Sequence, residues 1–515
     1  MSFPILSTIV FLPLIGGLIA LALPRQIAWG WAIAVALLDL VLTAIVGVQF
    51  QSGNAAFQFT EHQAWIPSLG LSYSMGVDGI SIFMIVLTAL LSVVTIAASV
   101  TQARDPQRSG MYFALMLMLV TGIQGVFLST NVFLFYVFWE IMLVPAYLLI
   151  GTFGGPRRTY AAIKFVIYTA IGSLLMLGGV IGLGVAVGGN TLDLQSLIGR
   201  VPADAQMILF LAFFAAFAVK VPLFSLHSWL PDAYTEAPIP VTVMLAGAMS
   251  KTGAYGILRF CLPLFPTAVR QAAPVILTLA VIGILYCAGQ ALVQTDFKRL
   301  LAYSSISHVS IIMLGIFALN AQGGDGAVMQ MVNHGITTGA LFLIAGFIEQ
   351  RTGTRSIRDL GGLATRLPIL AVVFFVAALS SLGLPGLNSF AGEFLALLGT
   401  FRANVVFGTL GTLVVIPAAW YLLRFFQGVM EGGKVAATEG TTATRNRNTA
   451  PIPVAHPTRD LSFGELGIVL PLLLLMVVVG FAPSFMPDRI EPSVQHVLNI
   501  TTPHVVPSLL TPPHR

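Results

Sequence analysis

The sequence predicts an all-α polytopic membrane protein, and three observations carry this prediction. Hydrophobic residues make up 57% of the 515 positions and only 9% are charged, whereas a soluble chain normally carries about 25% charge. The mean hydropathy is +0.91. Apolar stretches of roughly 20 residues, the length that crosses a bilayer as a helix, recur along the whole chain. A soluble globular class is therefore not expected.

Counting these stretches gives fourteen predicted helices. They cover residues 2–23, 28–50, 78–100, 110–128, 130–151, 160–187, 206–231, 239–262, 273–293, 299–319, 326–349, 366–400, 404–427 and 463–484. We expect breaks in the seventh helix at Pro222 and in the twelfth at residues 383–387, around Pro385, because proline lacks an amide hydrogen.

Three segments between or after the helices are polar or rich in turn-forming residues. Residues 51–77 are predicted to form a polar loop, and residues 429–462, rich in Thr, Pro and Gly, a linker. The tail 485–515 need not be ordered. The first apolar stretch lacks a basic start and is long enough to span, so it does not indicate a cleaved signal peptide.

Basic residues in loops predict the orientation in the membrane, since cytoplasmic loops carry the excess. Loops after odd-numbered helices hold fifteen of them, against five on the other side. Both termini are therefore expected to face away from the cytoplasm.

The two interrupted helices also indicate an internal repeat. Each combines a proline break with a charged residue, Lys220 in the seventh helix and Glu393 in the twelfth. The offset of five helices is odd, so the second unit must cross the membrane in the opposite sense. Inverted repeats with interrupted helices are typical of transport sites near the midplane. We expect units over 110–262 and 273–427, with 1–100 and 463–484 as additions.

Charged residues inside membrane helices are costly and are candidates for function. Glu140 lies centrally in the fifth helix and is predicted to pair with Lys220, so that separating the pair acts as a switch. Lys251 lies in the eighth helix, where its alternative role is a structural hydrogen bond to a carbonyl of a broken helix. Glu393 follows the second break.

Histidines extend this set, because a histidine passes protons readily near neutral pH. His308 and His334 lie in the tenth and eleventh helices, between Lys251 and Glu393 in chain order. Each is either a satisfied core residue or a relay group, and we favour the relay.

Other polar residues carry weaker predictions. Lys164 is either a relay group or an anchor at a helix end. His227 is predicted to lie in the turn between the seventh and eighth helices, where it caps that turn or lines a proton entrance. Arg259 and Arg424 are predicted to anchor helix ends, and Asp39 has no assigned role.

The sequence lacks the residues needed for several kinds of cofactor and metal binding. No nucleotide-binding glycine motif is present, and Cys261 and Cys287 cannot ligate an iron–sulfur cluster or a structural zinc. The net charge of +5 is scattered, so nucleic acid is not an expected partner. Any redox cofactor that drives ion movement is expected on another chain.

Six motifs carry a resemblance to a known family. They are MGVDGIS (75–81), FYVFWEIMLVPAYLLIG (135–151), HSWLPDAYTEAP (227–238), LAGAMSKTGAYGILRF (245–260), LAYSSISHVS (301–310) and SLGLPGLNSFAGEF (381–394). The chain resembles the antiporter-like membrane subunits of proton-pumping NADH:quinone oxidoreductase (respiratory complex I or NDH-1), in the group that includes subunit M and chain 4.

The resemblance implies a proton relay through six residues. They are Glu140, Lys220, Lys251, His308, His334 and Glu393. Glu393 distinguishes the chain from sister subunits with lysine at that place.

The resemblance also implies the setting in which the relay works. FMN, iron–sulfur clusters and quinone belong to other subunits, and the partners are sister membrane subunits and the lipid bilayer. The implied location is the bacterial inner (plasma) membrane, or alternatively a thylakoid membrane. The electron donor is NADH, NADPH or ferredoxin. The alternative function is a D-type subunit of a multisubunit Na⁺/H⁺ antiporter, which shares most of these motifs.

Overall fold

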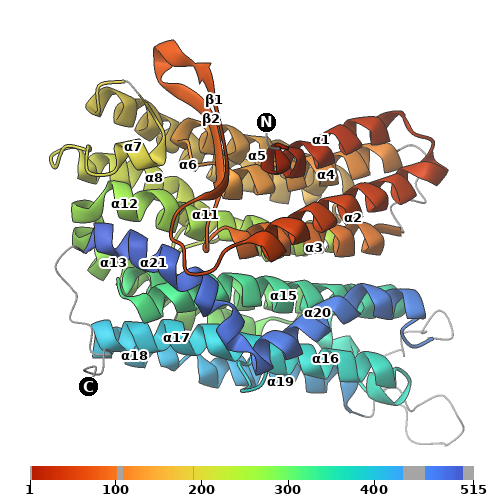
Figure 1. The fold of residues 1–515 in the computed structure, drawn as a ribbon. Coiled ribbons are helices and arrows are strands. Elements are labelled where there is room, and N and C mark those ends of the chain that lie inside the picture. Colours follow the sequence, from red (N-terminus) through yellow and green to blue (C-terminus); the bar gives the residue numbers. More distant parts are fainter. Residues whose placement is uncertain (1–2, 101–107, 190, 433–458, 503–515) are drawn as a thin grey trace, which may run out of the picture.

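The computed structural model describes residues 3–100, 108–189, 191–432 and 459–502. Most of its helices run alongside one another, with the first half of the chain on one side of the bundle and the second half on the other (Figure 1). Within the described residues, ten helices are long and apolar enough to cross a membrane. The predicted all-α membrane class is confirmed, with one small sheet added.

The first part of the chain contains three helices and a hairpin. Its elements are α1 (Ile5–Ala22), α2 (Arg25–Gln49), β1 (Gln58–Ile66), η1 (Pro67–Leu69), β2 (Leu71–Val77) and α3 (Ile82–Ala98). The prediction that 51–77 is only a loop is wrong, because β1 and β2 pair antiparallel around a turn in which Gly70 has φ +66°. Glycine adopts that conformation without strain.

The helices predicted from 110 to 262 are all present. They are α4 (Ser109–Leu128), α5 (Val132–Phe153), α6 (Arg158–Ala186), α8 (Gln206–Lys220), α9 (Trp229–Glu236), and α10 (Ile239–Met244) to α12 (Leu262–Leu264) with α11 (Lys251–Gly256) between them. The short α7 (Leu194–Leu197) precedes α8. The seventh helix breaks between α8 and α9, around Pro222, as predicted. His227 lies in this break, not in the turn to the eighth helix.

The second half of the chain follows the predicted order with two differences. Its helices are α13 (Pro266–Val293), α14 (Phe297–Phe317), α15 (Ala321–Thr352), α16 (Pro368–Ser381), α17 (Asn388–Ala403), α18 (Val405–Thr412), α19 (Val415–Met430), α20 (Phe463–Phe481) and α21 (Pro487–Thr501). The break between α16 and α17 contains Pro385, as predicted. The thirteenth helix was predicted to be continuous, but it divides into α18 and α19.

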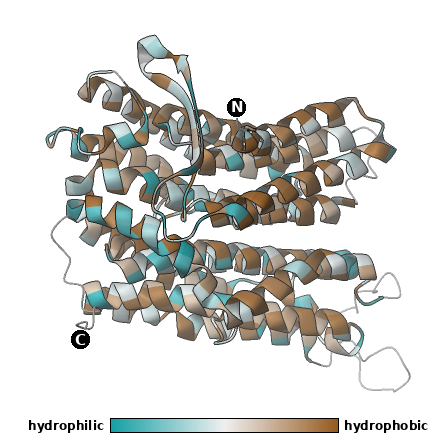
Figure 2. Ribbon diagram, in the orientation of Figure 1, coloured by the Kyte–Doolittle hydropathy of each residue, from teal (hydrophilic) through white to brown (hydrophobic). Residues whose placement is uncertain are grey.

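The C-terminal tail corrects a further prediction. Residues 487–501 form α21, whose buried side includes Ile490, Val494 and Val497. Packing of this amphipathic side against the bundle orders a segment that local sequence did not mark as helical. Figure 2 shows α21 with hydrophilic and hydrophobic residues alternating along its length. Most of the predicted linker 429–462 lies outside the described residues.

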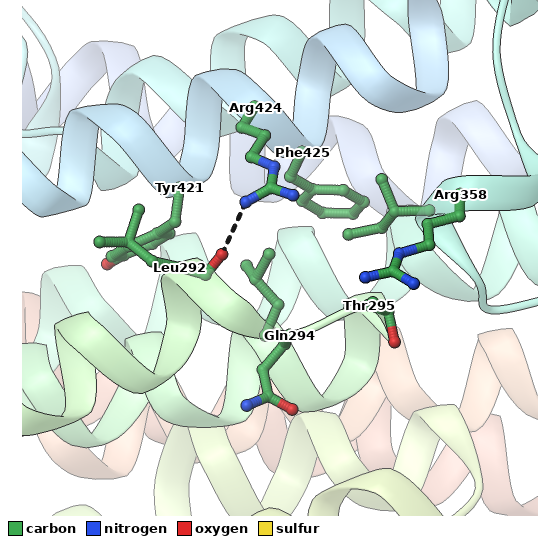
Figure 3. A pocket seen from close by; sticks show the side chains of 9 residues that line it. Leu292, Gln294, Thr295, Arg358, Tyr421, Arg424 and Phe425 are labelled. Carbon is green, nitrogen blue, oxygen red and sulfur yellow. Dashed lines mark hydrogen bonds between the residues drawn. The ribbon is translucent and has the colours of Figure 1, made fainter.

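Arginines fix helix positions in two ways. Arg424 Nη1 donates to the Leu292 carbonyl oxygen at 2.9 Å and ties α19 to the end of α13, which confirms its predicted anchoring role (Figure 3). Arg259 was predicted to anchor a helix end, but it is buried and pairs with Asp78 through two hydrogen bonds of 2.6 and 2.8 Å. A buried arginine needs such a partner, because an unpaired charge is costly there.

Candidate functional site

The break between α8 and α9 places Lys220 at the last residue of a half-helix. There its charge faces the negative end of the helix dipole. Pro222 has no amide hydrogen to donate to the Ala218 carbonyl, but the amide of Leu223 donates to it at 2.9 Å. The indole of Trp229 donates to Val219 O at 3.0 Å. Helical bonding thus stops at Lys220 while nearby carbonyls stay satisfied.

Lys220 and Glu140 approach each other without forming an ion pair. Lys220 is 2% exposed, and its Nζ lies 5.1 Å from the ring centre of Trp139 and 5.6 Å from that of Phe165. Among the described residues, neither Lys220 Nζ nor Glu140 Oε1 has a hydrogen-bond partner. The predicted direct pair is therefore absent from this structure, because the ammonium lies against aromatic faces.

Lys251 makes a direct contact between the two halves of the chain. It is 1% exposed, and its Nζ lies 2.7 Å from His334 Nδ1 on α15. The ammonium also donates to Ala246 O, a carbonyl of the eighth helix itself and not of a broken helix as predicted. On the other side of the imidazole, Nε2 lies 3.2 Å from the hydroxyls of Ser305 and Thr338.

The second cluster centres on Glu393 and His308. His308 Nδ1 lies 2.7 Å from Glu393 Oε1, and Gln330 Nε2 donates to the same oxygen at 2.7 Å. The hydroxyl of Tyr421 lies 3.3 Å from His308 Nε2. The rings of His308 and His334 are 6.2 Å apart between centres. The structure therefore brings four of the six predicted relay residues into two adjoining bonded groups.

Gln330 and Tyr421 belong to this cluster and were missed by the sequence reasoning. Each is a buried polar residue in a largely apolar helix. Both are uncharged, so a search for charges and histidines passes over them. The rule that buried polar groups need partners could have marked them.

Two amides hold the break of the twelfth helix against α15. Asn333 Nδ2 donates to the Asn388 carbonyl oxygen at 2.7 Å, and Asn388 Nδ2 donates back to the Asn333 carbonyl oxygen at 3.2 Å. Ser380 donates to Asn388 Oδ1 at 2.6 Å. Asn333 immediately precedes His334, so this reciprocal clasp sets the break beside the relay.

The secondary candidates are Lys164, which lies in α6, and His227, which lies in the break between α8 and α9. Lys164 Nζ donates to Asp232 Oδ2 at 2.8 Å, and Asp232 also accepts from Arg299 at 3.0 Å. His227 is flanked by Phe224 and Tyr286 at 5.7 Å between ring centres. In the part of the chain that the structure covers, His227 Nδ1 has no partner. Lys164 is thus ion-paired with Asp232, whereas the buried Nδ1 of His227 has no hydrogen bond among the described residues.

We find no candidate metal site in the described ranges. They contain no group of three or more His, Cys, Asp or Glu side chains that could hold a metal ion. Cys261 and Cys287 are both buried and free.

Comparisons with known proteins identify the family of the chain. A model described as "NADH:quinone oxidoreductase/Mrp antiporter, TM" matches residues 129–416, and one for the amino terminus of NADH-ubiquinone oxidoreductase chain 4 matches residues 10–124. NADH-quinone oxidoreductase subunit M of Rickettsia prowazekii is 39% identical over 507 residues, 97% of this chain and 99% of the relative. The Mycobacterium tuberculosis subunit M is 37% identical over 545 residues, 97% of this chain and 95% of the relative.

Solved structures are similar over the same extent. A chain of respiratory complex I from Thermus thermophilus with bound NADH has a TM-score of 0.85 at 32% identity, over 96% of this chain and 99% of that chain. A chain of the Mrp complex from Dietzia has a TM-score of 0.84 at 22% identity, over 98% of both, which shows a shared fold. The resemblance predicted from six motifs is confirmed. The chain belongs to the NADH:quinone oxidoreductase/Mrp antiporter transmembrane family.

Proposed function

We propose that this chain is the proton-translocating membrane subunit of an NADH-quinone oxidoreductase. The observation that carries the proposal is the 2.7 Å contact between Lys251 Nζ and His334 Nδ1, in the buried interior between the two halves. An amine and an imidazole at hydrogen-bond distance can exchange a proton. In the NADH-quinone oxidoreductases of this family, electron transfer on other subunits drives the movement of protons.

The proposed path runs from the break in the seventh helix to the break in the twelfth. Protons enter near Glu140 and Lys220, pass Lys251, His334 and His308, and leave near Glu393. The breaks at Pro222 and Pro385 lie next to the two ends of this path, where irregular backbone at membrane depth is tolerated beside a water-filled cavity. Lys164 and His227 are proposed to supply protons to the entrance. The units 110–262 and 273–427 are proposed to be the two inverted repeats.

The partners follow from the relatives. The solved complex I of Thermus thermophilus contains a similar chain, and we propose that sister membrane subunits flank this one in the same way. FMN, iron–sulfur clusters and quinone are assigned to other subunits. The proposed location is the bacterial inner membrane with both termini outside the cytoplasm, and a thylakoid membrane remains the alternative.

The second candidate is a D-type subunit of a multisubunit Na⁺/H⁺ antiporter. The similarity in fold to the Mrp complex chain favours it. The motifs MGVDGIS and FWEIMLVPAYLLIG and the full-length similarity to subunit M relatives favour the oxidoreductase.

Purification of the tagged chain from its native membrane separates the two candidates. The proposal predicts that flavin and iron–sulfur absorbance travel with the tag, together with NADH:quinone activity that acidifies one side of reconstituted vesicles. Isolation with small antiporter subunits, without flavin, would favour the antiporter.

A further inference from the structure

A small polar pocket lies between the end of α13, the start of α14, the turn η5 (Ile357–Asp359) and α19, at the end of the bundle that carries most of the basic loops. Its volume is about 30 Å³, which is room for one or two water-sized groups. The polar residues that line it are Gln294, Thr295, Arg358, Tyr421 and Arg424. Among the described residues that line the pocket, none is acidic, so its charge is positive.

The two arginines of this pocket turn their charged ends toward the same space. Figure 3 shows the guanidinium groups of Arg358 and Arg424 facing this space, together with Gln294 and Thr295. A guanidinium carries five N–H donors, and the Leu292 carbonyl oxygen accepts from one of those on Arg424. Guanidinium groups that converge in this way match the oxygens of a phosphate.

Carboxylates on the adjoining helix ends face a third arginine instead of the pocket. Arg355 Nε lies 3.4 Å from Asp296 Oδ2 and 3.6 Å from Glu349 Oε1. Asp359, the chain neighbour of Arg358, is exposed and does not line the pocket. The positive charge of the pocket is therefore suited to an anion that comes from outside the chain.

Exposed apolar side chains adjoin the pocket on both of its long helices. Ile416 and Trp420 precede Arg424 by two turns and one turn on the same face of α19, and they are 67% and 64% exposed. Val293, the last residue of α13, is 68% exposed. Tryptophan near the end of a membrane helix is typical of the headgroup level. A ligand with its anionic group on the arginines would thus have apolar surface for a hydrocarbon part.

We propose that the pocket binds the headgroup of an anionic phospholipid, with the phosphate between Arg358 and Arg424 and an acyl chain beside Trp420. The cavity takes phosphate oxygens, and the rest of the headgroup lies outside it. Basic pockets between membrane helices on the cytoplasmic side favour such headgroups. The inference goes beyond the proposed function, because binding requires no step of the relay.

The pocket also adjoins the second cluster of the relay. Tyr421 is buried and lines the pocket, and its hydroxyl lies 3.3 Å from His308 Nε2. A bound lipid would therefore hold α19 against α13 beside a residue that contacts His308, without itself carrying protons.

The test is photo-crosslinking of lipid to the whole complex. The complex is reconstituted in phosphatidylcholine vesicles that contain a trace of phosphatidylglycerol with a photoactivatable headgroup, and the crosslinked peptides of this chain are mapped. We expect crosslinks in α19 and in residues 292–300, which adjoin the pocket. Added phosphatidylglycerol should compete with the probe, whereas added phosphatidylcholine and inorganic phosphate should not.

Variants test the two arginines separately. Arg358→Gln and Arg424→Gln should each raise the phosphatidylglycerol concentration that halves crosslinking by about fivefold, the contribution of one basic residue at an anionic membrane surface. Arg424→Lys keeps the charge and should raise it less. Arg200→Gln is the matched control and should behave like the parent, because Arg200 is also exposed and donates to the Val187 carbonyl oxygen at the end of α6. If Arg424→Gln does not assemble, Arg358→Gln carries the test.

Four results would overturn the proposal. Equal competition by phosphatidylcholine would show that the apolar surface alone holds lipid, and equal competition by inorganic phosphate would show a site for free anions. An effect confined to Arg424→Gln would reflect only the anchoring of α19 to α13. Absence of crosslinks from α19 and residues 292–300 would show that another subunit covers this face of the chain.

Discussion

Lys251 on α11 and His334 on α15 share a contact of 2.7 Å between Nζ and Nδ1. These residues are 83 positions apart in the chain and belong to different predicted repeats. The contact joins the two halves of the proposed proton path at its centre. On one side of this contact, Lys220 and Glu140 are not bonded to each other. On the other side, His308 and Glu393 share a hydrogen bond. The two pairs therefore lead to separate predictions.

Glu140→Ala should abolish proton pumping and lower coupled electron transfer. The substitution leaves Lys220 buried without the only carboxylate predicted to balance its charge. Glu140→Asp keeps the charge with a shorter reach and should retain part of the activity. The measurement is NADH-driven acidification in reconstituted vesicles, with assembly checked on native gels. A fully assembled Glu140→Ala complex that pumps normally would exclude the switch.

Lys220→Ala should leave the chemistry of the other subunits intact. Oxidation of NADH by an artificial acceptor needs only the flavin on a peripheral subunit. We expect this activity to equal that of the parent while pumping is lost. Loss of acceptor activity in an assembled Lys220→Ala complex would show that this chain does more than move protons.

Asn388→Ala should loosen the break of the twelfth helix. It removes the half of the clasp that Asn388 Nδ2 donates to Asn333 O, together with the acceptor for Ser380. Each buried polar group left without a partner costs roughly 1–3 kcal/mol. We expect a lower thermal midpoint in detergent and weaker pumping. Thr278→Ala is the control, because the Thr278 hydroxyl donates to Pro274 O within its own helix in an exposed position. Equal midpoints for both variants would contradict the clasp.

The hairpin β1–β2 should depend on pH through Asp193, which lies in the loop before α7. Burial acts to raise the pKa of Asp193, but hydrogen bonds from Ser72 and Asn131 outweigh it, so the pKa lies below its ordinary value. A lowered pKa in the folded protein stabilises it above the unfolded value of about 3.9, and this contribution is lost as the pH falls through the folded value.

Asp193→Asn removes this titration. The variant should be cleaved faster than the parent within residues 58–77 at pH 7 in limited proteolysis. The difference should shrink as the pH falls below about 4. A difference that stays constant down to that pH would show that the carboxylate charge does not hold the hairpin.

The sequence was sufficient for most of the membrane helices and for the charged residues of the proposed relay. Apolar length marks membrane helices, and Glu140, Lys220 and Glu393 stand out because a charge in a bilayer is rarely without a role. Pro222 and Pro385 marked both breaks, since the lost amide hydrogen is a local property.

Contacts between distant segments could not be predicted from the sequence. The clasp of Asn333 and Asn388 and the placement of Tyr421 against His308 depend on tertiary packing of uncharged residues. The same holds for α21, which is ordered by the surface it covers. The separation of Lys220 from Glu140 also depends on packing, because Trp139 and Phe165 offer aromatic faces that the charge pattern does not reveal.

The most direct test of the relay is the pumping stoichiometry of Glu393→Gln. Glutamine keeps the shape and the hydrogen bonding to His308 and Gln330, but it cannot take up or release a proton. Glu393→Lys restores a titratable group, as in the sister subunits, and should pump in part. We predict that the Glu393→Gln complex assembles, reduces artificial acceptors normally and moves fewer protons per NADH oxidised. If it moves as many protons per NADH as the parent, Glu393 is structural and protons do not leave through it.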